Sequence, residues 1–296
     1  MIKIQNLNKS YDKRKVINNV CLNVKKGDIY GLIGRNGAGK TTLMKLILGL
    51  TQADDGTITI NNGEELSLAR KKIGSIIEEP GLYYGKTAFE NMKLFSLLYE
   101  GVKDEEIKSL LNRVGLGETG KKKVKGFSLG MKQRLGIAIA MMGKPDILIL
   151  DEPINGLDPM GIKEIRDMIL EMNAAGITFM ISSHLLDELG KIVTRYGIMS
   201  NGELVEEITA EELNKRCTKH VEISVDNKAA AIAILKKQFE NVDINETELK
   251  DTFYIMSEVE DTSLVNSLLV NNGVKVYSIY RQGSSLEDYF IERLGA

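Results

Sequence analysis

The chain has 296 residues, of which 43% are hydrophobic and 27% charged, and its formal net charge is −2. This composition is typical of a globular protein with room for one large and one small domain, and the near-neutral charge argues against a nucleic-acid binder. Cys21 and Cys217 stand outside any CxxC pattern, so no disulfide framework is expected. The longest apolar stretches, such as Leu135–Met142, are far shorter than the roughly 18–20 residues that cross a bilayer, and the first residues lack the apolar core of a signal peptide. We therefore expect a cytoplasmic protein.

Strand and helix signals alternate along the first part of the chain. Short apolar runs predict strands, and apolar residues spaced three and four apart predict helices. A helix is expected after Gly34, and the sequence from Thr87 to Met142 reads as mostly helical. The predicted strands are Ile2–Leu7, Val20–Val24, Ile29–Ile33, Gly56–Ile60, Lys72–Ile77, Ile147–Leu150 and Thr178–Ser182, and the other helices are Ala88–Tyr99, Asp104–Val114, Leu129–Met142 and Ile162–Asn173. This alternation predicts a parallel sheet flanked by helices.

The pattern changes near Glu211. From there the signals follow the order β-α-β-β-α-β with one further helix, which predicts a small α+β domain of the ferredoxin-like kind. The predicted elements are Val221–Val225, Ala229–Phe239, Val242–Asn245, Thr252–Met256, Thr262–Asn271, Val274–Tyr280 and Leu286–Leu294. We expect a first domain over residues 1–211, with a helical subdomain at about 87–142, and an accessory domain over residues 212–296.

A glycine-rich motif follows the third predicted strand. The segment Gly34-Arg-Asn-Gly-Ala-Gly39-Lys40-Thr41, called the glycine loop below, matches GxxxxGK[ST] between a strand and a helix. Glycines let the backbone N–H groups and the helix N-terminus surround phosphate oxygens. We expect Lys40 to bind the β- and γ-phosphates and the Thr41 hydroxyl to bind Mg²⁺.

Two carboxylates follow the apolar strand Ile147–Leu150. Parallel strands bind ligands at their carboxyl ends, so Asp151 and Glu152 are expected beside the glycine loop. Asp151 is suited to hold Mg²⁺ through water, and Glu152 is placed to polarise an attacking water molecule. The glycine loop and the acidic pair together predict a nucleotide site.

These motifs resemble those of the ABC ATPase family, over roughly residues 1–210. The segment Phe127-Ser-Leu-Gly-Met131, called the signature loop below, is similar to the family's LSGGQ motif at Ser128 and Gly130 but departs from it at Leu129 and Met131. The resemblance implies a RecA-like parallel sheet, an antiparallel β subdomain and a helical subdomain. It also implies that Tyr11 stacks on adenine, that Asn155–Asp158 communicates between subunits, and that His184 contacts the γ-phosphate.

The family resemblance implies ATP and Mg²⁺ as cofactors. The implied catalytic residues are Glu152 and His184, and the implied metal ligands are Thr41, Glu78 and Asp151. The nucleotide-binding residues are expected to be Tyr11, Gly34, Arg35, Asn36, Gly37, Ala38, Gly39, Lys40, Thr41, Thr42, Glu78, Ser128, Gly130 and Asp158.

Position 78 departs from the family pattern. The family usually has glutamine there, whereas this chain has Glu78, which adds a negative charge near the phosphates. Together with the signature loop and the ending Ser285-Leu-Glu-Asp-Tyr-Phe-Ile, this residue is similar to exporters of the bacitracin and lantibiotic-immunity branch. The leading interpretation is an ATPase subunit that powers export of an antibiotic peptide or a similar compound.

The number of motifs predicts partners. The chain has one glycine loop, one signature loop and one acidic strand, whereas the family binds ATP between the glycine loop of one subunit and the signature loop of another. The resemblance therefore implies that two identical chains dimerise on ATP binding. It also implies an integral membrane permease, which would hold the dimer at the inner face of the membrane. Three alternatives stay open: the ATPase of another exporter or an importer, a soluble ABC protein that acts on ribosomes or DNA, and a nucleotide-binding module without turnover.

Overall fold

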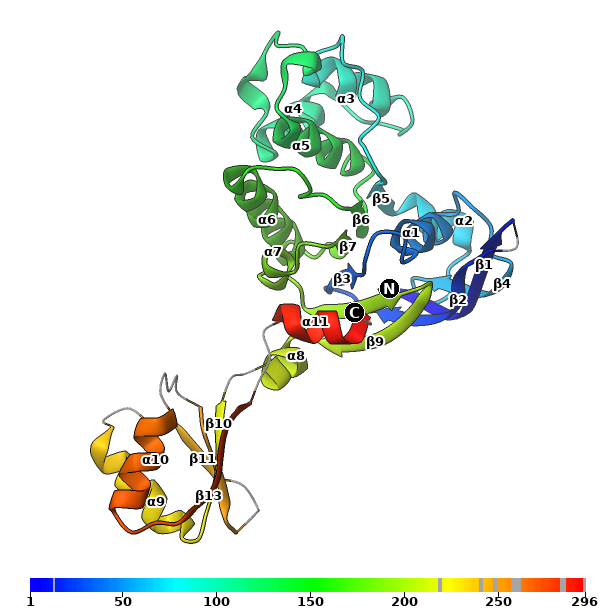
Figure 1. Cartoon of the computed structure of the whole chain (residues 1–296). Helices are drawn as coiled ribbons and strands as arrows, with labels where there is room; N and C mark the ends of the chain where they lie inside the picture. Colours follow the sequence, from blue (N-terminus) through cyan, green and yellow to red (C-terminus); the bar gives the residue numbers. More distant parts are fainter. Residues whose placement is uncertain are drawn as a thin grey trace. The chain divides into compact units, whose positions relative to one another are not determined.

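The computed structural model describes residues 1–12, 14–217, 220–239, 242–246, 250–256, 262–282 and 286–294. They form two compact units (Figure 1). The first contains Met1–Ala210 and the end of the chain from Arg293, and the second contains Glu211–Glu292. The sequence predicted a division between residues 211 and 212 and a second domain that reaches the chain end. The structure instead groups Arg293 and Leu294 with the first unit, where Arg293 Nε lies 2.9 Å from Glu206 Oε2.

The first unit contains two sheets and a group of helices. Its strands are β1 (Ile2–Tyr11), β2 (Arg14–Val24), β3 (Ile29–Ile33), β4 (Asp55–Ile60), β5 (Ile73–Ile76), β6 (Ile147–Asp151), β7 (Thr178–Ser183), β8 (Arg195–Ser200) and β9 (Glu203–Thr209). Its helices are α1 (Lys40–Leu48), α2 (Leu66–Lys71), α3 (Ala88–Ser96), α4 (Asp104–Arg113), α5 (Leu129–Ala140), α6 (Pro159–Ala174) and α7 (Leu186–Gly190). Among the described residues no helix is long and apolar enough to cross a membrane.

The larger sheet has the order β5-β6-β7-β3-β8-β9, in which only the β8–β9 pair is antiparallel. A separate antiparallel sheet has the order β2-β1-β4. Helix α1 packs between the two, because its buried residues share one core with Ile147 and Ile149 of β6 and with Ile2 and Ile4 of β1. The predicted parallel sheet is confirmed, and the order places the carboxyl ends of β6, β7 and β3 side by side.

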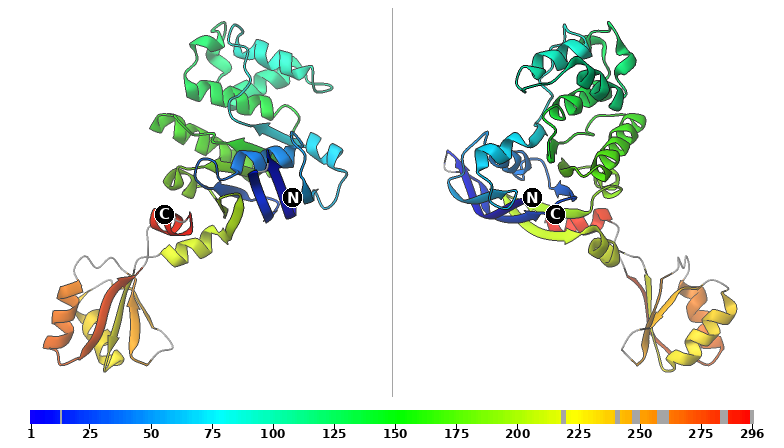
Figure 2. Two further views of the ribbon diagram at one scale, coloured as in Figure 1. Left: turned by 45° about the vertical axis from the view of Figure 1, so that its right-hand side comes forward. Right: turned by 180° about the vertical axis from the view of Figure 1, so that it is seen from behind.

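Helices α3, α4 and α5 form a helical group beyond the β5 edge of the large sheet (Figures 1 and 2). The capping box of Thr87 and Glu90 starts α3, and Ser128 caps α5 by accepting a hydrogen bond from the N–H of Met131. The predicted helix Ala88–Tyr99 ends at Ser96 instead, because Leu97, Leu98 and Tyr99 continue in i→i+3 turns.

Several elements were not predicted from the sequence. They are α2, α7, β8 and β9, together with the first half of β2 from Arg14. Residues 14–19 are mostly polar and carry no strand signal of their own. They become a strand because they pair with β1, as in the Tyr11–Arg14 and Lys9–Ile17 pairs of the register.

The second unit is built around a four-stranded antiparallel sheet. Its elements are α8 (Ala210–Cys217), which starts at the last residue of the first unit, β10 (His220–Val225), α9 (Lys228–Gln238), β11 (Ile244–Glu246), β12 (Thr252–Ile255), α10 (Thr262–Asn271), β13 (Val276–Gln282) and α11 (Leu286–Leu294), whose last two residues belong to the first unit. The strand order is β11-β12-β10-β13, and the predicted β-α-β-β-α-β succession is confirmed. Alternate residues of β10 and β12, such as Val221 and Phe253, pack with residues of α9 and α10 to form the core of this unit. Ser285 of the ending motif lies outside the described residues.

Gly74 lets the helical group approach the sheet. A Cβ atom on this residue of β5 would lie 2.2 Å from the carbonyl oxygen of Ala140 at the end of α5. Because that atom belongs to the backbone, Gly74→Ala should lower the free energy of unfolding by about 1–3 kcal/mol. Thermal or urea unfolding measures the effect, and Gly81→Ala is the control, since its Cβ would meet no atom within 4 Å. Equal stability of the two variants would contradict this packing.

Candidate nucleotide site

The glycine loop connects β3 to α1. Gly37 and Gly39 have φ angles of 82° and 104°, a region that glycine enters at little cost. The side chain of Lys40 is buried, and its Nζ donates a hydrogen bond to the Gly34 carbonyl at 2.7 Å. The loop therefore curls around the lysine ammonium, and its residues line a pocket.

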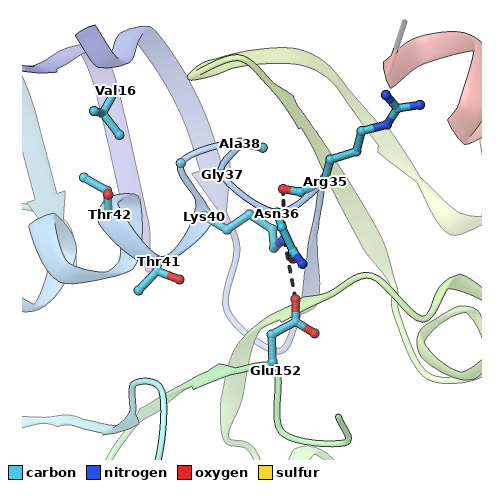
Figure 3. Close-up of a pocket in the computed structure, with 10 residues that line it drawn as sticks. Val16, Arg35, Asn36, Gly37, Ala38, Lys40, Thr41, Thr42 and Glu152 are labelled. Atoms are coloured by element: carbon cyan, nitrogen blue, oxygen red, sulfur yellow. Dashed lines mark hydrogen bonds and ion pairs between the residues drawn. The ribbon is translucent and has the colours of Figure 1, made fainter. Parts of the chain in front are cut away.

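That pocket contains most of the predicted phosphate-binding residues. It is lined by Val16, Arg35, Asn36, Gly37, Ala38, Gly39, Lys40, Thr41, Thr42 and Glu152. Figure 3 shows Lys40 and Glu152 pointing toward each other, whereas the Arg35 side chain points away from them. Arg35 therefore contributes its backbone to the pocket, and its guanidinium does not reach the acidic side of the site.

Asp151 ends β6 beside the start of α1. Its Oδ2 accepts a hydrogen bond from Thr41 Oγ1 at 2.7 Å, so the two predicted metal ligands are neighbours. The carboxylate is buried, and its second oxygen accepts a hydrogen bond from the Ser182 hydroxyl of β7. A buried carboxylate with these partners presents oxygen ligands of the type that Mg²⁺ prefers.

Glu152 follows β6 and lies between Lys40 and His184. Its Oε1 is 3.5 Å from Lys40 Nζ, and its Oε2 is 2.8 Å from His184 Nδ1. Oε1 is buried and has no hydrogen-bond partner among the described atoms. The backbone of this residue has a φ of 49°, in the left-handed region that residues other than glycine, asparagine and aspartate rarely adopt. This carboxylate is thus held beside the phosphate pocket with one oxygen free to accept a hydrogen bond.

Tyr11 lies in an adjoining hollow. This hollow is lined by Tyr11, Arg14, Lys15, Val16, Gly37, Asn201 and Gly202, and it shares Val16 and Gly37 with the phosphate pocket. Tyr11 is 46% exposed, and Lys9 Nζ lies over its ring, 5.3 Å from the ring centre. The predicted stacking position and the phosphate pocket are therefore contiguous.

Ser128, Gly130 and Asp158 do not line this pocket. They lie at the N-termini of α5 and α6, where Ser128 and Asp158 cap their own helices. The two helix starts are neighbours, since a Cβ on Gly130 would lie 3.8 Å from Leu157 Cδ2. Leu129, where the signature loop departs from the family motif, is half exposed. The structure thus groups these predicted residues as a second surface, apart from the glycine loop.

Glu78 is placed beside a lysine of α1. Its Oε1 accepts a hydrogen bond from Lys45 Nζ at 2.8 Å, and its side chain is 67% exposed. This hydrogen bond holds the pKa of the Glu78 carboxyl below its ordinary value and raises the pKa of the Lys45 ammonium. Both groups are charged at neutral pH, so the extra negative charge of this position is balanced locally. The structure does not place Glu78 in contact with Thr41 or Asp151, its predicted companions at a metal.

The sequence did not reveal three residues of the site. Ser182 contacts both acidic residues, Lys45 balances Glu78, and Val16 separates the two hollows. Ser182 was visible only as the last residue of a predicted strand. Its role depends on the register of β6 with β7, where it pairs with Asp151.

Comparison with known proteins gives the family. The family model described as "ABC transporter" matches residues 17–155. The bacitracin transport ATP-binding protein BcrA of Enterococcus faecalis is 42% identical over 100% of this chain and 96% of its own length. The chain belongs to the ABC transporter family. It is an ATP-binding subunit with ATPase activity, which confirms the family resemblance.

Two further relatives match about 70% of the chain. The lantibiotic transport ATP-binding protein SrtF of Streptococcus pyogenes is 50% identical over 69% of this chain and 89% of its own length. A solved dimeric ATP-binding cassette in a post-hydrolysis state with ADP and Pi has a TM-score of 0.64 at 26% identity, covering 71% of this chain and 99% of that chain. The ABC cassette fold, with its parallel core sheet and antiparallel subdomain, is therefore shared by these proteins.

Proposed function

We propose that this ABC ATPase hydrolyses ATP as a dimer and thereby powers export of an antibiotic peptide, or a similar amphipathic compound, through a separate membrane permease. The observation that carries the proposal is the placement of Glu152 between Lys40 and His184 beside the glycine loop. The names of its relatives, which concern bacitracin and lantibiotic transport, support the choice of cargo.

The phosphates of ATP would bind in the glycine-loop pocket. The backbone N–H groups of the loop and the N-terminus of α1 favour an anion there, and Lys40 adds a full positive charge. Thr41 and Asp151 would hold Mg²⁺, because their oxygens already lie 2.7 Å apart and hard oxygen ligands suit that ion. The ion would neutralise phosphate charge during transfer. Tyr11 would stack on the adenine in the adjoining hollow.

Glu152 would orient and polarise the attacking water. Its Oε2 is fixed by His184, and its Oε1, which is buried beside Lys40 without a hydrogen-bond partner, would accept a hydrogen bond from that water once the nucleotide is bound. His184 would contact the γ-phosphate when ATP is bound. Lys40 and His184 then stabilise the charge that develops on the transferred phosphoryl group.

A second chain would complete each site. Ser128, Gly130 and Asp158 form a surface apart from the glycine loop, which suits a role toward the nucleotide of a partner subunit. Two chains facing each other head to tail would each supply a glycine loop and a signature loop. The two subunits would dimerise when ATP binds and separate after hydrolysis, and this conformational cycle would drive transport.

Membrane association would come from the permease. The helical group at about residues 87–142 and Glu78 would form the side that receives it, which places the protein at the inner face of the cell membrane. Residues 1–211 would act as the ATPase domain. The strand succession and antiparallel sheet of the second unit support a ferredoxin-like accessory domain within Glu211–Glu292.

A protection assay tests this function. The chain is expressed in a susceptible bacterium together with the membrane protein that co-purifies with it, and the inhibitory concentrations of bacitracin and of a lantibiotic are measured. We expect protection against at least one of them with the parent chain and none with Glu152→Gln. Equal protection by both chains, or protection without the membrane protein, would show that the proposed function is wrong.

A further inference from the structure

The carboxyl end of β7 places one hydroxyl between the two acidic residues of the site. Ser182 is fully buried, and in the sheet it pairs with Asp151 on one side and with Leu32 of β3 on the other. Its Oγ donates a hydrogen bond to Asp151 Oδ1 and accepts one from the N–H of Glu152 at 2.9 Å. A single side chain therefore contacts the carboxylate of one acidic residue and the backbone of the next.

The backbone of Glu152 needs such a contact. Its φ of 49° lies in the left-handed region, which is unfavourable for a glutamate and persists only where the surroundings hold it. The hydrogen bond from its N–H to Ser182 fixes the peptide plane just before the turn. The direction of the Cα–Cβ bond follows from that plane, so the same contact helps to aim the carboxylate at Lys40 and His184.

We propose that Ser182 is a positioning residue for ATP hydrolysis, which holds the Glu152 backbone in its left-handed conformation and orients Asp151 at the same time. This inference rests on the proposed catalytic role of Glu152. Ser182 has no contact with the pocket itself, so it acts through its two acidic neighbours. Its loss should slow the chemical step while leaving the nucleotide pocket intact.

A second buried hydroxyl in the same strand offers a matched control. Thr178, at the opposite end of β7, is also fully buried, and its Oγ1 accepts a hydrogen bond from the N–H of Gly27 at 3.0 Å. If buried hydroxyls of β7 matter only for stability, Thr178→Val and Ser182→Ala should have the same consequences. If Ser182 positions Glu152, only the second variant should impair hydrolysis.

The test compares kcat, the KM for ATP, the Kd for ADP by calorimetry and the melting temperature. For Ser182→Ala we expect kcat to fall by about 10- to 100-fold, the size of effect that a misplaced catalytic group produces. The KM for ATP and the Kd for ADP should stay within about twofold, because Ser182 does not line the pocket and Asp151 keeps its hydrogen bond from Thr41. Ser182→Cys, which keeps the shape of the side chain but replaces oxygen with a larger sulfur that forms weaker hydrogen bonds, should change kcat in the same direction.

For Thr178→Val we expect kcat within about twofold of the parent value, despite a lower melting temperature from the lost hydrogen bond. The positioning role is overturned if Ser182→Ala and Ser182→Cys keep the parent kcat, or if all three variants lose kcat together. Glu152→Gln is measured in parallel. Full turnover by that variant would refute the proposed catalytic role itself, whereas inactive Glu152→Gln with active Ser182 variants would refute only the inference about Ser182.

Discussion

Glu152→Gln should reduce steady-state ATP hydrolysis by at least about 100-fold, which is the contribution expected of a general base. The amide keeps the shape of the side chain but cannot accept a proton from water, and it no longer balances Lys40, 3.5 Å away. ATP should still bind, because the glycine loop is unchanged. Phosphate release measures the rate, and light scattering should detect a dimer that forms with ATP and persists.

Glu118→Gln is the control for this experiment. Glu118 is exposed and lies in the short turn between α4 and α5, away from the pocket. The Glu118→Gln variant should hydrolyse ATP at the parent rate and show no persistent dimer. If Glu152→Gln also turned over ATP at the parent rate, another group would have to activate the water, and the assignment of Glu152 would be wrong.

Lys40→Met should weaken ATP binding by about 10- to 100-fold, since a charge-assisted hydrogen bond contributes about 1.5–3 kcal/mol. The Lys40 side chain is 6% exposed and is the cation nearest Glu152 in the pocket. Methionine keeps the apolar stem but removes the ammonium that would face the phosphates. Fluorescent-nucleotide titration gives the affinity, and hydrolysis at saturating ATP should also be lost.

Lys108→Met serves as the comparison for this variant. Lys108 is an exposed residue of α4 in the helical group. Its replacement removes the same charge from the chain. If Lys40 acted only through general electrostatic attraction, both variants would lose the same affinity for ATP. Unchanged affinity in Lys40→Met would mean that the glycine loop does not bind the nucleotide as proposed.

Local sequence was sufficient for the parts of the site that lie on consecutive residues. The glycine loop and the pair Asp151-Glu152 each follow an apolar strand, and the parallel sheet brings the two strand ends together as predicted. The order of elements in the second unit was also predicted, because alternation and helical spacing are strong there. These signals need no knowledge of which strands are neighbours.

Long-range contacts explain what the sequence did not reveal. Ser182 matters because β7 lies between β6 and β3, and that strand order is a property of the whole sheet. The hydrogen bond from Lys45 to Glu78 likewise joins residues 33 positions apart. The left-handed backbone of Glu152 has no local signal either, since glutamate is an unusual residue for that conformation.

The grouping of Arg293 with the first unit has a consequence for the order of synthesis. The polypeptide leaves that unit after Ala210 and rejoins it at Arg293, so the second unit is an insertion and not an appendage. A growing chain must therefore complete all of Glu211–Glu292 before Arg293 can pair with Glu206. Since domains generally fold as they emerge from the ribosome, the inserted unit can fold before the ATPase makes its last internal contact.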